Sequence, residues 1–427
     1  MEIDELYQLY KKSEGVSTDT RVDLQKKLFF CLKGPNFNAN QFAKDALEKG
    51  ALAVISDEEK NRDIEGVVVV SDSLEVLQNL AIHHRQTFEF PVLGLTGSNG
   101  KTTNKELIHA VLSKKYRTYA TKGNLNNHIG VPLSILNIGS DAEFAVIEMG
   151  ANHQGEIRDL SKISDPDFGM ITNIGKAHLE GFGGIEGVKK GKKELFDHIR
   201  AKKAKLFVNG DDSLLMEISE GIERTLFGTS QSFFIHGKIE QSTPTLSFSF
   251  QQGKYQSSKI TTQLTGDYNF NNLMAAVCVG RYFDVEYADI ESALSNYTPK
   301  NNRSQIKKTE KNTIILDAYN ANPTSMLAAI ENLSKMPGEK KIALLGHMLE
   351  LGEAAQSEHK AILSKLEERE LDALLVGHHF IECQPNFPVF KNSEELKKHL
   401  LEKPLKDHQI LVKGSRSVEM EKIIPSL

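Results

Sequence analysis

The sequence of 427 residues is poor in cysteine and has no long apolar segment. Its three cysteines, Cys31, Cys278 and Cys383, lie far apart without CxxC spacing, which argues against a disulfide framework and a cysteine zinc site. No stretch approaches the roughly 20 apolar residues of a membrane helix. The first residues include early acids and no long apolar run, so we expect no secretory signal. These absences predict a cytoplasmic protein that does not insert into membranes.

The overall composition excludes several further classes of protein. The net charge of −5 gives no indication of nucleic acid as a partner. No internal repeat or low-complexity segment is visible, and a hydrophobic content of 39% is ordinary for a globular protein. The length is too great for one typical core, so we expect two to four domains.

The stretch PVLGLTGSNGKTT, residues 91–103, is the most informative motif. A short apolar run, 92–95, predicts a strand, and apolar residues at helical spacing follow the glycine-rich segment. Strand, glycine loop and helix form the setting in which backbone N–H groups and a helix N-terminus bind phosphate. Lys101 would reach the terminal phosphates and Thr102 would hold Mg²⁺. An ordinary glycine-rich turn is the alternative, because Leu95 stands where the usual pattern has glycine.

Two further strands are predicted to deliver polar side chains to the same edge of a parallel sheet. Glu148 ends the apolar strand FAVIE, and His178 follows the strand 168–172. Ligands collect at the carboxyl edge of such sheets, and a carboxylate beside a nucleotide loop can hold Mg²⁺. A solvent-facing Glu and a loop His are the alternatives for either residue alone.

A lysine cluster at 189–193 lies in a segment with helical periodicity. At about 100° per residue, one face collects the apolar residues Ile185, Val188, Leu195, Phe196 and Ile199. Lys192 falls near the centre of that face, whereas Lys190 and Lys193 fall outside it. A buried ammonium is unfavourable unless it is paired or chemically changed.

The remaining segments predict an α/β organisation in three domains, 1–88, 89–298 and 299–427. Strand candidates at 28–32, 51–55 and 67–70 belong to the first domain. Those at 314–316, 342–345, 374–376 and 410–412 alternate with helices, which predicts a second parallel sheet resembling a dinucleotide-binding fold. No Gly-x-Gly-x-x-Gly follows the first of these strands, so we do not expect a nicotinamide cofactor.

Motifs along nearly the whole chain resemble the Mur ligase family. TGSNGKTT is similar to the ATP loop shared by Mur ligases and folylpolyglutamate synthases. The likeness extends to STDTR, GNLNNHIGVP, ITNIGKAHLEGFGG, GVKKGKKELF, LDAYNANPTSM and LVKGSRSVEME. Of these, GNLNNHIGVP, LDAYNANPTSM and LVKGSRSVEME resemble the D-alanyl-D-alanine-adding branch of the family. The resemblance implies the three-domain Mur ligase architecture, with a central phosphate-loop ATPase-like parallel sheet and a Rossmann-like C-terminal domain.

The matching motifs also imply roles for individual residues. The resemblance assigns ATP to Thr96, Gly97, Ser98, Asn99, Gly100, Lys101, Thr102 and Thr103, with Asn272 and then Asn269 at the adenine, Asp317 at the ribose and Arg303 at the phosphates. It assigns the UDP-linked substrate to Ser17, Asp19, Arg21 and Lys33, Asn126 and Asn127 to substrate binding, and the incoming dipeptide to Asn320, Asn322 and Ser415. It implies that Lys192 is carbamylated by CO₂, and that Thr102, Glu148, His178 and carbamyl-Lys192 hold two Mg²⁺ ions. Lys101, Glu148, His178 and Lys192 would be the catalytic residues.

The predicted function is therefore that of an ATP-dependent amide ligase, acting as a monomer in peptidoglycan precursor synthesis. The resemblance implies UDP-N-acetylmuramoyl-tripeptide and D-alanyl-D-alanine as its substrates, joined through an acyl phosphate. Another Mur-type amide ligase or a folylpolyglutamate synthase is the alternative enzyme. The latter lacks a segment matching STDTR. A regulatory switch that binds ATP without making a bond is the alternative from a different class.

Overall fold

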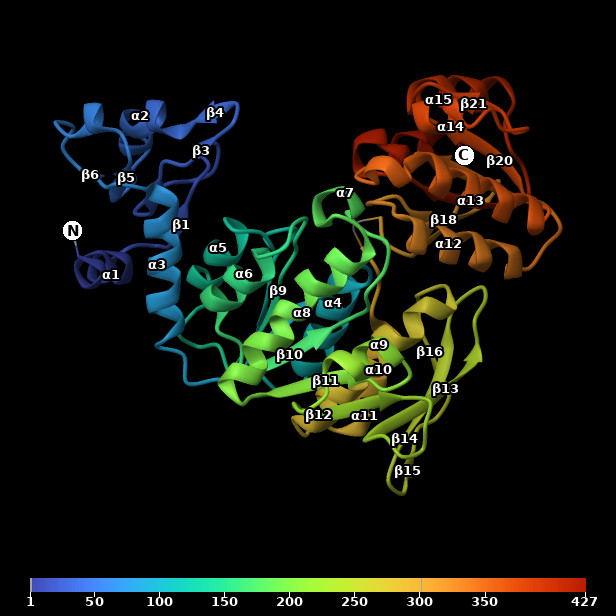
Figure 1. The fold of residues 1–427 in the computed structure, drawn as a ribbon, viewed down its shortest axis with the longest axis horizontal. Helices are drawn as coiled ribbons and strands as arrows, with labels where there is room; N and C mark the ends of the chain where they lie inside the picture. The colour runs from blue at the N-terminus through green and yellow to red at the C-terminus, as the bar shows by residue number, and fades with distance from the viewer. Residues whose placement is uncertain (1, 301) are drawn as a thin grey trace.

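The computed structural model describes residues 2–300 and 302–427, and three separate β-sheets divide this chain into three parts (Figure 1). The N-terminal sheet has four parallel strands in the order β1-β2-β5-β6. These are Val16–Ser17, Leu28–Phe30, Ala53–Ser56 and Val67–Val69, accompanied by the hairpin β3 (Lys33–Gly34) and β4 (Phe37–Asn38). The helices of this part are α1 (Ile3–Lys12), α2 (Ala43–Glu48) and α3 (Ser73–Arg85).

The central sheet has ten strands in the order β15-β14-β13-β12-β11-β10-β7-β9-β8, with β16 paired to β14. Its parallel strands are β7 (Val92–Thr96), β8 (Thr118–Ala120), β9 (Phe144–Glu148), β10 (Phe168–Ile171), β11 (Lys205–Asn209), β12 (Glu223–Gly228) and β13 (Ile235–Gln241). The strands β14 (Ser247–Gln252), β15 (Tyr255–Gln256) and β16 (Ile260–Thr261) add an antiparallel extension. The sequence did not predict this extension.

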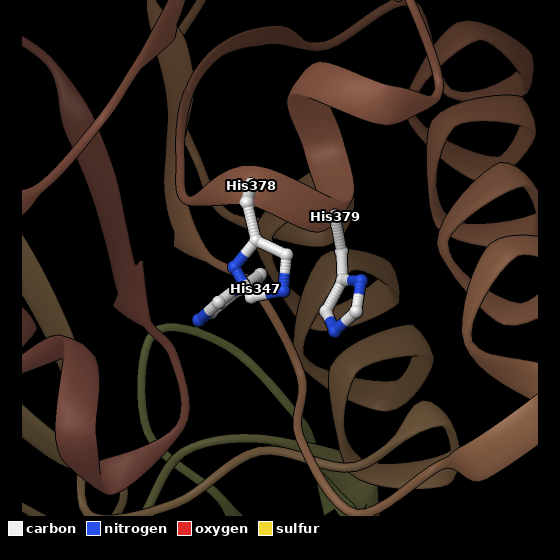
Figure 2. A group of neighbouring side chains, drawn as sticks. All are labelled: His347, His378 and His379. Carbon is white, nitrogen blue, oxygen red and sulfur yellow. The ribbon is translucent and has the colours of Figure 1, made fainter.

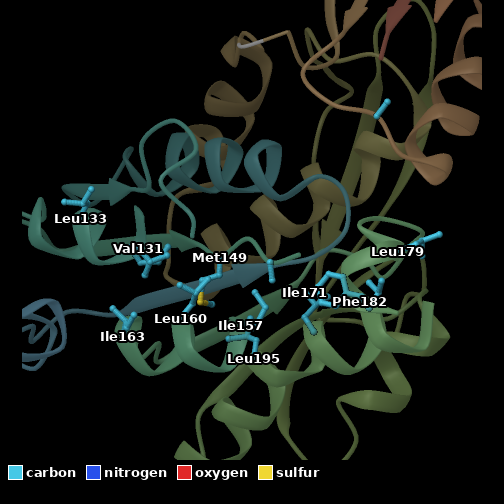
Figure 3. Close-up of a cluster of buried hydrophobic side chains, with 14 of the residues drawn as sticks. Val131, Leu133, Met149, Ile157, Leu160, Ile163, Ile171, Leu179, Phe182 and Leu195 are labelled. Carbon is cyan, nitrogen blue, oxygen red and sulfur yellow. The ribbon is translucent and has the colours of Figure 1, made fainter. Parts of the chain in front are cut away.

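Helices cover both faces of the central sheet, because its middle strands are buried on both sides. Alternate residues of β7 and β9 enter two different apolar clusters: Leu93 and Val146 join one, Val92 and Ala145 the other. The first cluster includes α4 (Lys101–Leu112), α10 (Phe270–Tyr282) and α11 (Tyr287–Asn296). The second includes α5 (Gly130–Leu136), α6 (Glu156–Ser164) and α8 (Ile185–Lys202), as Figure 3 shows. The short helices α7 (Leu179–Phe182) and α9 (Ser213–Ile218) complete this part.

The C-terminal sheet has six strands in the order β17-β18-β22-β19-β20-β21, and all but β17 run parallel. They are Gln305–Lys308, Thr313–Asp317, Gln409–Lys413, Lys341–Gly346, Asp372–Val376 and Val389–Phe390. Helices α12 (Pro323–Lys335) and α13 (Ala355–Glu368) pack on one face, and α15 (Ser393–Glu402) packs on the other. The short helix α14 (His378–Glu382) follows β20.

The N-terminal and C-terminal sheets lie at opposite ends of the molecule, with the central sheet between them (Figure 1). Helix α3 joins the N-terminal part to the central one, and Gln78 Nε2 donates to the His128 carbonyl at 3.0 Å. None of the helices in the described residues is long and apolar enough to cross a membrane. The fold class predicted from the sequence is confirmed, and each predicted strand coincides with an observed one to within two residues at either end. The domain boundaries at residues 88 and 298 stay predictions.

Candidate active site

The loop between β7 and α4 has a backbone that requires glycine. Gly100 has φ 78° and directly precedes α4. A side chain at Gly97, which has φ 147°, would come within 2.0 Å of Thr172 Oγ1. Lys101 folds over this loop, and its Nζ donates to the carbonyl oxygens of Gly97 at 2.7 Å and Ser98 at 3.3 Å. The loop therefore places an ammonium group beside the start of a helix, as a phosphate site requires.

One expectation about this loop is wrong in detail. Its successive N–H groups were expected to point inward, but two of them bind a neighbouring loop instead. Ser98 N donates to the Asn173 carbonyl at 3.0 Å, and Asn99 N donates to Asn173 Oδ1 at 3.1 Å. The Thr172–Asn173 segment after β10 therefore fixes the first half of the loop, and the phosphate-binding donors are left to its second half and to Lys101.

Glu148 ends β9 beside this loop and is 1% exposed. Its Oε1 accepts hydrogen bonds from Thr102 Oγ1 at 3.2 Å and from Asn126 Nδ2 at 2.8 Å. Its Oε2 has no hydrogen-bond partner within the described residues. The buried Lys105 Nζ lies 3.9 Å from that oxygen. A buried carboxylate oxygen without a donor is expensive unless a cation approaches it.

Lys192 is buried in α8 and 1% exposed. Its Nζ donates to the Ala151 carbonyl at 3.3 Å and lies 5.1 Å from the centre of the Phe182 ring. Burial, then repulsion from Lys101, lowers the pKa of Lys192 well below its usual value. Burial also lowers the pKa of Lys101, to about 8, with Glu148 opposing the shift and Arg303 adding to it.

The other lysines of α8 behave as the helical periodicity predicts. Lys190 is exposed, whereas Lys189 and Lys193 are partly exposed and pair with Glu217 and Asp197. One apolar member of the predicted face does not belong to it. Ile185 is 42% exposed, because it is the first residue of the helix and precedes the point where α8 packs against the sheet.

His178 precedes α7 with φ 52°, a left-handed conformation that is uncommon outside glycine. Its Nδ1 lies 2.5 Å from Glu350 Oε2 in the C-terminal part, and this contact lowers the pKa of Glu350. Further contacts join the same two parts: Glu180 N donates to the Glu350 carbonyl at 3.1 Å, and Asn322 Nδ2 donates to Asn99 Oδ1 at 2.7 Å. The C-terminal part therefore already contacts the phosphate loop.

The predicted adenine residues form a chain of amide hydrogen bonds beside α4. Asn272 Nδ2 donates to Asn269 Oδ1 at 2.9 Å, and Asn272 Oδ1 accepts from Asn104 Nδ2 at 2.5 Å. Asn269 Nδ2 in turn donates to the Thr265 carbonyl at 2.8 Å. The two predicted residues thus lie together and next to Gly100, where an added side chain would approach Asn272 Oδ1 to 2.8 Å.

Asp317 and Arg303 lie where β18 and the segment before β17 face the phosphate loop. Asp317 Oδ2 accepts from Lys413 Nζ at 2.5 Å, and Asp317 Oδ1 accepts from Ser304 N at 3.1 Å. The Arg303 guanidinium stacks on the Tyr319 ring at 3.7 Å, and its Nε has no hydrogen-bond partner in the described part of the chain. Stacking leaves the edge of a guanidinium free to bind oxygen atoms.

One cavity of about 790 Å³ connects most of these residues. Among the predicted site residues it is lined by Ser98, Asn99, Gly100, Lys101, Thr102, Thr103, Asn126, Asn127, Glu148, His178, Asn269, Asn272, Arg303, Asp317, Asn320 and Asn322. Thr96 and Gly97 lie in the strand and loop directly before its wall. Lys192 contacts the Ala151 carbonyl behind it, and Ala151 itself lines the cavity.

Ser415 does not line this cavity and is 3% exposed. Its Oγ accepts from Leu349 N at 3.0 Å, and its N donates to the His347 carbonyl at 3.2 Å. In this structure it fixes the loop after β19.

Four predicted substrate residues lie outside the cavity, in the N-terminal part. Arg21 donates through Nη2 to Asp19 Oδ2 at 2.7 Å, and both side chains are exposed. Ser17 ends β1 and accepts from Asp19 N at 3.2 Å. Lys33 forms ion pairs with Asp57 at 3.0 Å and Glu58 at 3.7 Å. The structure gathers these four in one part of the molecule but does not join them to the phosphate loop.

The sequence missed several residues that complete the site. Lys105, Thr121, Tyr319, Glu350 and Lys413 each contact a predicted site residue or position a neighbour. Lys413 ends a parallel strand at the carboxyl edge, so strand position could have found it. Lys105 lies in α4, whose sequence has the pattern of an ordinary amphipathic helix. No signal in the sequence indicates that this lysine is buried.

Comparison with known proteins agrees with this geometry over nearly the whole chain. Residues 95–280 match the family described as Mur ligase middle domain, and residues 302–416 match Mur ligase, glutamate ligase domain. The chain belongs to the Mur ligase family. Its relatives include the UDP-N-acetylmuramoyl-tripeptide--D-alanyl-D-alanine ligases of Bacillus subtilis (34% identical, covering 97% of this chain and 93% of that one) and Escherichia coli (32%, covering 97% and 93%).

Solved Mur ligase structures share the whole fold. A crystal structure of MurF from Acinetobacter baumannii has a TM-score of 0.87 at 30% identity, covering 98% of this chain and 97% of that one. The MurF ligase of Thermotoga maritima in complex with ADP has a TM-score of 0.86 at 27% identity, with the same coverage. A folylpolyglutamate synthase of Mycobacterium tuberculosis, 13% identical with a TM-score of 0.65, shares the fold alone.

Proposed function

We propose that this Mur ligase joins D-alanyl-D-alanine to UDP-N-acetylmuramoyl-tripeptide with hydrolysis of ATP, in peptidoglycan precursor synthesis. The observation that carries the proposal is one cavity in which a phosphate loop, a buried carboxylate and the carboxyl edge of the C-terminal sheet meet. The names of relatives that match 97% of this chain give the substrates. Among the solved relatives, one contains ADP, which supports ATP as the nucleotide.

ATP lies with its phosphates on the loop before α4 and its base beside Asn269, which directly precedes α10, and Asn272 in its first turn. Lys101 carries the charge that compensates the terminal phosphates, and it exchanges its bonds to the Gly97 and Ser98 carbonyls for phosphate oxygens. Asn272 and Asn269 offer amide donors and acceptors to the adenine edge. Asp317 accepts from the ribose while Lys413 holds its carboxylate in place.

The residues around Glu148 fit magnesium. Glu148 Oε2 is buried and has no donor within the described residues, and the Thr102 hydroxyl donates to the other oxygen of the same carboxylate. Oxygen ligands of this kind suit Mg²⁺. When bound, Mg²⁺ would neutralise charge on the phosphoryl group, with Thr102, Glu148, His178 and modified Lys192 as the protein ligands that the family resemblance implies. His178 reaches such a site only through the ring nitrogen that does not face Glu350.

Lys192 fits carbamylation for a physical reason. An amine must be neutral to attack CO₂, and burial beside Lys101 keeps the Lys192 amine neutral at lower pH than usual. The nitrogen bonds to the carbon of CO₂ and loses one proton, which leaves a carbamate. The product places a negative carbamate near Lys101, which attracts it, whereas an ammonium at Lys192 would be repelled.

The reaction then proceeds in two displacements. A carboxylate oxygen of the tripeptide attacks the γ-phosphorus of ATP and ADP leaves, which gives an acyl phosphate. The amine of D-alanyl-D-alanine attacks the acyl carbon, and the carbon–oxygen bond to phosphate breaks as the amide forms. Positioning and charge neutralisation supply most of the catalysis of such phosphoryl transfer. Asn320 and Asn322 hold the dipeptide against the acyl carbon, with Ser415 positioning the loop beside them.

The three predicted domains divide this work, with 1–88 binding the UDP-linked substrate, 89–298 ATP and 299–427 the dipeptide. Ser17, Asp19, Arg21 and Lys33 lie outside the cavity, so we propose that the N-terminal domain moves toward it when substrate binds. Closure would keep water from the acyl phosphate. Small-angle scattering should show compaction when an ATP analogue and the UDP substrate are both present, and no compaction would contradict closure. We propose that the enzyme acts as a monomer in the cytoplasm.

Phosphate release tests the proposed function most simply. With ATP, UDP-N-acetylmuramoyl-tripeptide and D-alanyl-D-alanine, the purified protein should release phosphate, and omission of any one should reduce release to background. Two further assays test the alternative ligases. A single amino acid in place of the dipeptide tests another Mur-type ligase, and glutamate with a folate acceptor tests a folylpolyglutamate synthase. Equal turnover without either cosubstrate would instead indicate a nucleotide switch.

A further inference from the structure

Three histidines gather in the C-terminal part, at a place that the proposed reaction does not use. They are His347, directly after β19, and His378 and His379, the first two residues of α14 after β20. One ring nitrogen from each lies within 4.8 Å of one from both others. Figure 2 shows the rings of His378 and His379 extending from the first turn of α14, with His347 beside them.

The arrangement leaves ring nitrogens without protein partners. His347 is 8% exposed, and its Nδ1 has no hydrogen-bond partner in the ranges that the structure describes. His379 Nδ1 lies 3.3 Å from Glu382 Oε2, one turn later, which leaves its Nε2 for another ligand. A carboxylate on the far nitrogen is the usual way in which a metal-binding histidine is oriented.

A neighbouring histidine shows what a purely structural imidazole looks like here. The Nδ1 of His359 lies 2.6 Å from the Ala355 carbonyl, and its Nε2 accepts from Met348 N at 3.0 Å. Both nitrogens of His359 are therefore used, and the ring fixes the chain after His347. In the part of the chain that the structure describes, the three clustered rings make one side-chain hydrogen bond, between His379 and Glu382, so protein partners do not explain why they gather.

We propose that His347, His378 and His379 form a binding site for Zn²⁺ or a similar divalent metal ion, separate from the ATP cavity. Imidazole nitrogens suit such metals, whereas Mg²⁺ prefers oxygen. Three nitrogens of a tetrahedral zinc site lie about 3.4 Å apart when each is about 2.05 Å from the metal. Small rotations of the three rings would close the present spacing to that value. The fourth position is open to solvent, because His378 is exposed.

Bound metal would stiffen the loop that faces the active site. The His347 carbonyl accepts from Ser415 N at 3.2 Å, and Glu350, three residues later, contacts His178. A side chain at Gly377 would come within 2.6 Å of the His347 ring, so the chain before α14 is also packed against this site. The ion would therefore link the loops after β19 and β20 at the edge that the dipeptide approaches. Metal binding itself does not depend on the proposed function, and only the link to the dipeptide rests on it.

Metal binding can be measured on untagged, metal-free protein with excess Mg²⁺ present to occupy oxygen-ligand sites. Titration with Zn²⁺ against a chromophoric chelator should show one equivalent bound, and Co²⁺ should give the visible absorption of a tetrahedral nitrogen site. His379→Gln should lose the stoichiometric site, and Glu382→Gln should weaken it roughly tenfold or more. His399→Gln, a partly exposed histidine of α15 in the same part, is the matched control and should bind as the wild type does.

The readouts separate metal binding from simple packing. Zn²⁺ should also raise the thermal midpoint of the wild type and of His399→Gln, but not of His379→Gln. The site would be refuted by fewer than one equivalent in the wild type, or by equal binding in wild type and His379→Gln. If His379→Gln fails to fold, His378→Gln decides, because this ligand is exposed and its substitution should not disturb packing: an unchanged Co²⁺ spectrum and affinity in that variant would overturn the assigned ligand set.

Discussion

Polar residues gather at the carboxyl edges of both the central and the C-terminal sheet, but the two edges differ in whether their buried charged groups are paired. At the central edge, Lys101 lowers the pKa of the buried Lys192 by charge repulsion, and Glu148 Oε2 has no hydrogen-bond donor among the residues that the structure describes. At the C-terminal edge, Asp317 is paired with Lys413 at 2.5 Å. Unsatisfied buried charge is unfavourable in the free protein and becomes favourable when a ligand of opposite charge binds.

The difference indicates a division of labour between the two edges. In the proposed mechanism, the central edge receives the phosphoryl group, where charge develops during the reaction. The paired charges of the C-terminal edge hold side chains in fixed positions, as binding of a ribose or a peptide requires. Substitutions at the central edge should therefore abolish catalysis without loss of stability, whereas those elsewhere should change binding.

The largest effect is expected at Lys101. Lys101→Ala should lower the rate of phosphate release by about 100-fold or more, because the charge that stabilises the transferring phosphoryl group is removed. Its thermal midpoint should stay near that of the wild type, because the substitution removes only the hydrogen bonds from a partly buried ammonium to two loop carbonyls. Near wild-type turnover in the purified variant would contradict a catalytic role for the central edge.

Lys192→Ala comes next and tests the carbamate. Activity should fall severely, and added acetate should restore part of it by supplying the missing carboxylate. Lys190→Ala and Lys193→Ala should change little, because Lys190 is exposed and Lys193 pairs with Asp197 on the outer face. If Lys192 only packs against Phe182, the variant should be near normal in rate and unaffected by acetate. If Lys193→Ala loses activity instead, the modified lysine is Lys193 and the predicted register is one residue too early.

Arg21→Ala should act on substrate binding alone. We expect KM for the UDP-linked substrate to rise about tenfold or more, since a bidentate contact to diphosphate is lost, while kcat and KM for ATP stay the same. Arg62, which forms a similar exposed pair with Glu59, offers the control Arg62→Ala. An equal change in both variants would show a general charge effect rather than a substrate contact.

The smallest effect is a pH dependence of stability. Burial lowers the pKa of Lys101 from 10.5 to about 8. The unfolded chain therefore binds more protons than the folded one between those values, and stability should rise with pH across that window. The slope from this group is at most about 1.4 kcal/mol per pH unit. In denaturant titrations without nucleotide, Lys101→Met should lose this slope, whereas Lys190→Met should keep it.

The sequence predicted the strands and the phosphate loop because these features are local. Apolar runs such as 92–95 and 144–147 must be buried strands, and the glycines of the loop require special backbone angles. Helical periodicity alone found Lys192, because its position among apolar neighbours is a property of one helix. The prediction failed for Ile185 for the same reason: periodicity does not say where along its length a helix begins to pack.

Contacts between distant segments could not be read from the sequence. Two examples are the pairing of His178 with Glu350 and the stacking of Arg303 on Tyr319. The sequence around each of these residues does not predict its contact partner. The bonds from the Ser98 and Asn99 amides to Asn173 likewise depend on how two loops of one sheet edge meet. The histidine cluster is of this kind too, because β19 and β20 are adjacent only in the folded sheet.

Isotope transfer from the tripeptide tests the central claim most directly. The terminal carboxylate of UDP-N-acetylmuramoyl-tripeptide is labelled with ¹⁸O, and the products formed with ATP and D-alanyl-D-alanine are separated and weighed. If the central edge directs that carboxylate to the γ-phosphorus, each released phosphate carries one ¹⁸O atom and the nucleotide product carries none. Phosphate without label, or label in the nucleotide, would contradict the account.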